Sequence, residues 1–109
     1  MGFAASSARL YMLVARKSDL EFQLQMINQA RLRLTNVLDK IYLASASLDP
    51  ENPAVRKQEL LLQRIQAQDK RLEIIANRVT LQHQAVETEI GAVNKVIQQN
   101  IQSSFKLMG

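Results

Sequence analysis

The segment Ser45-Ala46-Ser47-Leu48-Asp49-Pro50-Glu51-Asn52-Pro53, residues 45–53, decides the fold of this chain. Its two prolines lack backbone N–H donors and disfavour a helical conformation at Asp49 and Asn52, the residues that precede them. We therefore expect a turn over residues 47–53 that depends on Asp49, Pro50, Asn52 and Pro53. Asn52 is placed to cap a second helix that has Pro53 at its first position.

On both sides of this turn, apolar residues recur every seven positions, which is typical of helices that pack along one seam. A helix is expected from about residue 6 to residue 46, with Ser6 or Ser7 as its N-cap, and its repeat is Leu13, Leu20, Ile27, Leu34 and Ile41. A second helix is expected from about residue 53 to residue 106, and its repeat is Ile65, Leu72, Val79, Val86 and Val93. The sequence therefore predicts an all-α fold: two long helices in an antiparallel, coiled-coil-like hairpin, forming a single domain over residues 1–109.

The positions beside this intramolecular seam are partly polar. Lys17 and Arg31 interrupt the companion line of the first helix, and Asp69 and His83 interrupt that of the second. Such interruptions weaken a seam but favour one register over the alternatives. Gly91 costs about 1 kcal/mol relative to Ala inside a helix, so it indicates either a bend or a close approach by another helix.

Further apolar residues lie outside the seam, where one partner helix in a hairpin cannot cover them. A second line follows the first helix at Phe22, Met26, Ala30 and Val37, and apolar residues continue almost to the C-terminus. Exposed apolar lines of this kind favour association, so we expect assembly with many copies of this chain. The expected oligomer interface consists of Phe22, Met26, Val37, Val96, Ile97, Ile101 and Phe105. The alternative is that the second line faces the core of an ordinary helical bundle.

Composition and motifs exclude several other functions. The net charge is +4, from 14 basic and 10 acidic residues that alternate along both halves, and aromatic residues are few, so no nucleic-acid partner is expected. Without cysteine, and with His83 and Glu87 supplying at most two ligands on one face, we expect no metal and no cofactor. No nucleophile has an accompanying base, so the chain is not expected to be an enzyme.

The N-terminal region contains basic residues that bear on its relation to membranes. Its apolar run, residues 10–15, is too short for a signal peptide core or for a membrane span, so neither a cleaved signal nor stable membrane insertion is expected. A basic amphipathic helix lying on anionic lipid is a further alternative, although Asp19 and Glu21 interrupt its charge; it is based on Arg9, Arg16, Lys17, Arg31 and Arg33.

The turn at residues 49–53 and the C-terminal segment 93–106 resemble the needle subunits of bacterial type III secretion systems. The resemblance implies hairpins that stack helically into a hollow filament, with the C-terminal helix toward the lumen and the termini ordered by neighbouring subunits. It also implies that Pro50, Asn52 and Pro53 form the turn, while Val96, Ile97, Ile101 and Phe105 lie in subunit contacts. Export without a cleaved signal to the cell surface or medium, with a secretion apparatus as partner, would follow.

Two features depart from that family. Both helices are several turns longer than in a typical needle subunit, and residues 4–34 instead resemble the start of a group of small uncharacterised bacterial proteins, at Ala8-Arg9-Leu10 and residues 15–21. The alternative function is a small cytoplasmic helical adaptor or export chaperone that acts as a discrete oligomer.

Overall fold

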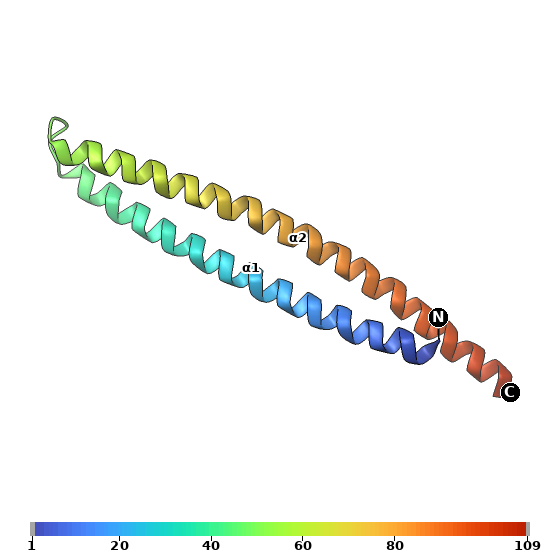
Figure 1. The fold of residues 1–109 in the computed structure, drawn as a ribbon. Coiled ribbons are helices and arrows are strands. Elements are labelled where there is room, and N and C mark those ends of the chain that lie inside the picture. Colours follow the sequence, from blue (N-terminus) through green and yellow to red (C-terminus); the bar gives the residue numbers. More distant parts are fainter. Residues whose placement is uncertain (1, 109) are drawn as a thin grey trace. The chain divides into compact units, whose positions relative to one another are not determined.

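The computed structural model describes residues 2–108 and contains two helices, α1 (Phe3–Ala46) and α2 (Pro53–Met108). A short turn over residues 47–52 joins them (Figure 1). The described residues contain no strand, which confirms the predicted all-α helical hairpin. Within this range, neither helix includes a stretch long and apolar enough to cross a membrane.

The turn is held by hydrogen bonds from the residues around its prolines. The Asn52 side-chain oxygen accepts the Ala54 N–H at 3.0 Å, which satisfies one of the free donors at the start of α2. The Asn52 N–H donates to the Asp49 carbonyl at 2.9 Å, and the Glu51 N–H donates to the Asp49 carboxylate at 3.3 Å. Asn52 is therefore the N-cap of α2, and Pro53 is its first residue.

The start of α1 differs from the sequence prediction. The helix begins at Phe3, and the Ser6 N–H donates to the Gly2 carbonyl at 2.9 Å. The prediction that Ser6 or Ser7 caps this helix is therefore wrong. Ser6 instead lies seven residues before Leu13 in the seam line, and its side chain is fully buried.

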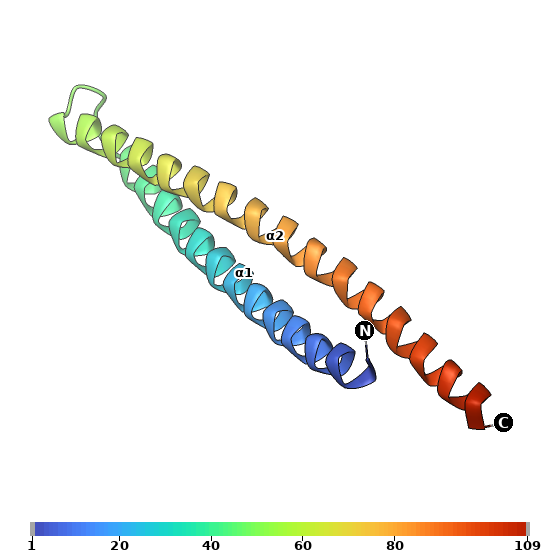
Figure 2. The same cartoon turned by 45° about the vertical axis from the view of Figure 1, so that its right-hand side comes forward.

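The chain divides into two compact units, and each contains part of both helices. We call residues 2–23 with residues 79–108 the terminal unit, and Leu24–Arg78 the turn unit. Within each unit, α1 and α2 lie side by side and run in opposite directions (Figures 1 and 2).

The seam is buried to different extents in the two units. In the terminal unit, five members of the seam are buried: Leu13, Leu20, Val79, Val86 and Val93. In the turn unit only Ile41 and Ile65 are buried, while Ile27, Leu34 and Leu72 are half-buried. Every buried apolar residue of the described chain thus belongs to the seven-residue repeat, and the turn unit covers its part of that repeat less completely.

Candidate functional site

The outer surface of α1 is the first candidate, because it leaves many large apolar side chains exposed. Apolar and polar residues are mixed evenly around α1, whereas α2 concentrates its apolar residues on one side. The apolar residues outside the seam could be covered only by a further helix, since α2 can cover only one side of α1. The exposed large apolar side chains of α1 are Phe3, Tyr11, Met12, Val14, Phe22, Met26, Leu32, Val37, Tyr42 and Leu43.

Three of the expected interface residues lie on this exposed surface. Phe22 is 62% exposed, Met26 is 49% exposed and Val37 is 43% exposed. Phe22 and Met26 are one helical turn apart and therefore share a face of α1. They belong to different units, so each contributes apolar surface to its own unit. Nothing within the described residues buries them.

The C-terminal end of α2 is the second candidate. α2 continues past the start of α1 within the terminal unit (Figures 1 and 2). Phe3 borders an open hollow with Asn100, Ile101, Ser104 and Phe105, and this hollow is almost wholly apolar. Phe105 is 73% exposed and Ile101 is also exposed, whereas Val96 and Ile97, nearer the middle of α2, are half-buried.

Gly91 lies on the same side of α2 as Phe105, since fourteen residues are two seven-residue repeats. A Cβ atom added at Gly91 would meet nothing within 4 Å. The close approach predicted for this glycine is therefore not made by the described part of this chain. The exposed backbone at Gly91 leaves room for a helix from outside the chain.

Polar residues that interrupt the seam pair with each other across the hairpin. In the turn unit, the Arg31 guanidinium donates to both carboxylate oxygens of Asp69, with Nε–Oδ1 at 2.8 Å and Nη2–Oδ2 at 3.3 Å. The bond from Arg31 lowers the pKa of the Asp69 carboxyl, and the same bond raises the pKa of Arg31. The Ser45 hydroxyl similarly donates to the side-chain oxygen of Gln58. These bonds tie the register of α1 to that of α2 in the turn unit.

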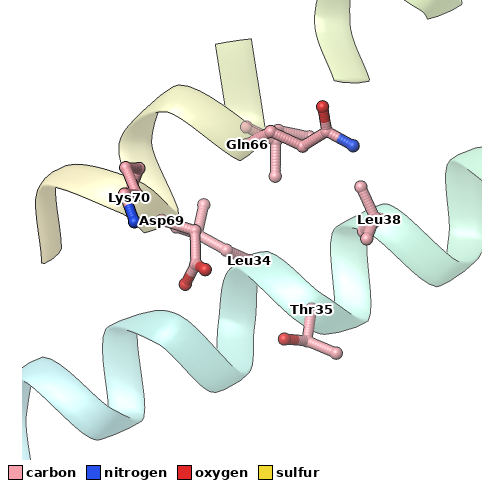
Figure 3. A pocket seen from close by; sticks show the side chains of 7 residues that line it. Leu34, Thr35, Leu38, Gln66, Asp69 and Lys70 are labelled. Atoms are coloured by element: carbon pink, nitrogen blue, oxygen red, sulfur yellow. The ribbon is translucent and has the colours of Figure 1, made fainter. Parts of the chain in front are cut away.

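Asp69 also borders a small hollow in the turn unit. Its lining consists of Leu34, Thr35, Leu38, Ile65, Gln66, Asp69 and Lys70. Figure 3 shows the carboxyl group of Asp69 directed from α2 toward α1, close to Leu34. The hollow combines one carboxylate, already bound to Arg31, with aliphatic side chains, and Thr35, Gln66 and Lys70 add polar groups at its border.

In the terminal unit, the interruptions Lys17 and His83 form a cluster with Glu21 and Glu87. The His83 Nε2–H donates to Glu21 Oε1 at 3.0 Å, and His83 Nδ1 lies 3.8 Å from Glu87 Oε1. Lys17 Nζ lies 3.6 Å from the Glu87 carboxylate and 4.0 Å from that of Glu21. The hydrogen bond from His83 is the largest cause of the lowered pKa of Glu21, and the positive charge of Lys17 lowers it further.

This cluster has the chemistry of an ion-pair network. Lys17 occupies the space beside both carboxylates, so it competes with any cation for them. Among the described residues, no three histidine or acidic side chains are grouped so that they would hold a metal ion. The sequence identified Lys17 and His83 as interruptions and placed Glu87 on one face with His83, but it did not indicate that these residues meet Glu21 across the hairpin.

Comparisons with known protein families, with curated proteins and with solved structures found no match to this chain. The resemblance to needle subunits thus rests on the residues of the turn and of the C-terminal segment, and it remains a prediction.

Proposed function

We propose that this chain is a structural subunit that self-assembles, in many copies, into a helical filament or tube similar to a type III secretion needle. The observation that carries the proposal is the set of large apolar side chains that α1 leaves exposed outside the seam, among them Phe22, Met26 and Val37. Polar residues lie between them, so the outer side of α1 is mixed, whereas a helix that faces water alone would ordinarily be polar there. Burial against neighbouring copies would remove this apolar surface from water at about 25 cal/mol per Å².

The C-terminal end of α2 supplies a second contact for a neighbouring copy. Phe3, Ile101 and Phe105 form an open apolar surface at the end of the terminal unit. An exposed apolar surface of this kind is consistent with contacts to another subunit. Gly91 supports the same interface, since its side of α2 admits the close approach of a helix.

A chain with apolar surfaces at two separate places favours extended assembly over a closed pair. If the surface of α1 in one copy meets the C-terminal surface of the next, the contact is heterologous, and repeated heterologous contacts give rings or helical filaments. In this proposal the filament forms outside the cell or at its surface, after export without a cleaved signal. A discrete oligomer would favour the cytoplasmic adaptor.

Charge substitutions at the two surfaces test this proposal. We expect Phe105→Asp and Phe22→Asp each to reduce the sedimentable fraction of the protein by about tenfold or more, because each would bury a charge without a partner. Circular dichroism should show the same helix content as in the wild type, since both side chains are exposed in the isolated hairpin.

A matched control adds the same charge at an exposed polar position. Ser103→Asp lies two residues from Phe105, on the opposite side of α2, and should leave assembly unchanged. If Phe105→Asp assembles as readily as the wild type, the C-terminal end is not part of the interface. If both Phe variants assemble as readily as the wild type, the proposal is contradicted.

A further inference from the structure

A shallow groove between α1 and α2 lies on one side of the turn unit. Residues of both helices line it: Ala30, Arg33 and Leu34 of α1, and Gln68, Arg71, Leu72 and Ile75 of α2. The lining is almost entirely apolar, and its charged members are one arginine from each helix, with no carboxylate. The groove therefore combines an apolar floor with positive charge contributed from both sides.

The floor of this groove is the part of the seam that the hairpin leaves open. Leu34 and Leu72 both belong to the seven-residue repeat, yet both are only half-buried. Ala30 is too short to cover Leu34 from the side, and neither Gln68 nor Ile75 forms a bond across the groove within the described residues. Apolar surface of this kind gains free energy when another apolar side chain covers it.

The positive charge continues along the same side of both helices. Seven residues from Arg33 and Arg71, toward the turn, lie Lys40 and Arg64, and a step of seven residues returns to the same face of a helix. All four cations are exposed, and none forms an ion pair with another described residue. Two unpaired cations thus line the groove itself, and further unpaired cations lie on the same side of both helices.

We propose that this groove binds an amphipathic helix of a different protein, whose apolar stripe is bordered on both sides by Asp or Glu. The apolar stripe would cover Leu34 and Leu72, and the acidic borders would meet Arg33 on one side and Arg71 on the other. A nucleic acid would pair with the cations but leave the apolar floor in contact with polar atoms. A lipid surface is too flat to reach a floor that lies between two helices.

Charge complementarity argues against a second copy of this chain as the occupant. A helix with acidic borders needs acids that recur at about seven-residue intervals, and no two of the 10 acidic residues of this chain are seven apart. Five of them are already in ion pairs within the hairpin: Glu21, Asp69, Glu73, Glu87 and Glu89. The groove shares Ala30 with the second apolar line of α1 but uses none of the residues of the expected oligomer interface, so binding is measured on dilute, unassembled chain, where it does not depend on filament formation.

Designed helical peptides test this site on the full chain. The acidic probe is a fluorescent 21-residue peptide, about three repeats long, with leucine on one stripe and glutamate on both borders; the basic probe has lysine in place of glutamate. We expect the acidic peptide to bind at least about tenfold more tightly than the basic one, measured by fluorescence anisotropy.

A charge reversal at the groove should exchange this preference. The double variant Arg33→Glu with Arg71→Glu should bind the acidic peptide about tenfold or more less tightly than the wild type does. The same variant should bind the basic peptide more tightly than the wild type does. A gain of binding cannot result from unfolding, so it separates recognition from loss of structure. The control, Arg56→Glu with Lys95→Glu, makes the same change in net charge at exposed positions outside the groove and should retain the acidic preference.

Four results would overturn the proposal. The first is equal affinity for the two peptides, and the second is an equal loss of acidic-peptide binding in the control variant. The third is binding of a serine-striped acidic peptide or a DNA duplex as tightly as the leucine-striped one, which would make the site a general polyanion site. The fourth is displacement of the peptide by unlabelled chain, which would make the occupant a second copy.

Discussion

The terminal unit and the turn unit use the same two helices and the same seven-residue repeat, but they bury that repeat to different extents. In the terminal unit, long side chains cross between the helices beside the seam, as in the Arg9–Glu89 pair at 3.3 Å and the Lys17–Glu87 pair at 3.6 Å. Their aliphatic parts cover apolar neighbours while the charges stay in water. In the turn unit, the Arg31–Asp69 pair closes one side of the seam, whereas the other side holds Ala30 and Ile75 and has no ion pair between described residues.

The comparison shows that a good apolar repeat is not enough to bury a two-helix seam. The residues beside the repeat decide whether it is covered, and in the turn unit they leave Leu34 and Leu72 half-buried. The turn unit therefore has more to gain from a third helix, although the covalent turn already holds its two helices together.

Truncation of seam leucines should give the largest difference between the units. Leu20 in the terminal unit is 4% exposed, whereas Leu34 in the turn unit is half-buried. We expect Leu20→Ala to reduce the free energy of unfolding by about 3 kcal/mol, and Leu34→Ala by about 1.5 kcal/mol, because less contact is lost at the open site. Urea unfolding of dilute protein, followed by circular dichroism, measures both values.

The exposed Leu32 provides the control for this pair, and Leu32→Ala should change the unfolding free energy by less than about 0.5 kcal/mol. Equal losses at Leu20 and Leu34 would mean that the turn unit buries its seam as well as the terminal unit does.

A smaller effect is expected at Gly91 in the terminal unit. In dilute protein, Gly91→Ala should raise the free energy of unfolding by about 0.5–1 kcal/mol, since the new methyl group meets nothing and a helical alanine is favoured over glycine. If a neighbouring subunit packs against this glycine, the same variant should assemble less readily than the wild type, as measured by light scattering. If dilute Gly91→Ala protein is no more stable than dilute wild-type protein, α2 is strained at residue 91.

The polar contacts beside the seam, Arg31–Asp69 in the turn unit and His83–Glu21 in the terminal unit, should make stability depend on pH. The pKa of Asp69 is lowered mainly by the hydrogen bond from Arg31, and the pKa of Glu21 mainly by that from His83. A carboxyl whose folded pKa lies below its unfolded pKa stabilises the fold above the unfolded value, and this stabilisation is lost as the pH falls through the folded value. Asp69→Asn and Glu21→Gln should therefore be less stable than the wild type at pH 7.

Both differences should shrink as the pH falls through the lowered folded pKa of each carboxyl, because the wild-type carboxyls then become protonated too. We expect the larger effect for Asp69, because Arg31 binds both of its oxygens and the Glu21 side chain is more exposed. Melting temperatures recorded between pH 2 and pH 7 provide the test. A difference between wild type and variant that persists at pH 2 would show that the side chains act through shape and not through charge.

Much of the fold follows from local sequence signals. Pro50 and Pro53 exclude a continuous helix, Asn52 is a good cap, and the seven-residue repeats identify the residues that lie in the seam. Ser6 shows where such signals fail. As a serine near a helix start it has the preference of an N-cap, but its position in the repeat places it in the seam, and packing overrides the local preference.

The features that involve both helices were not accessible from the sequence. Arg33 and Arg71 are far apart in the chain, and their shared groove depends on the register fixed by the Arg31–Asp69 bonds. Basic and acidic residues alternate along the chain, yet the cations gather on one side of the turn unit, because alternation along a sequence does not persist on one helical face. The contacts of Lys17 with Glu87 and of Glu21 with His83 were not predicted for the same reason, since each joins the two helices.

The central claim is that the exposed apolar surfaces of this hairpin bind further copies of the chain. Negative-stain electron microscopy of the purified protein, concentrated slowly from dilute solution with light scattering on the same sample, tests it most directly. Our account predicts long filaments of uniform width above a threshold concentration. A monodisperse monomer or dimer at high concentration would contradict it and would favour an adaptor whose partner is another protein.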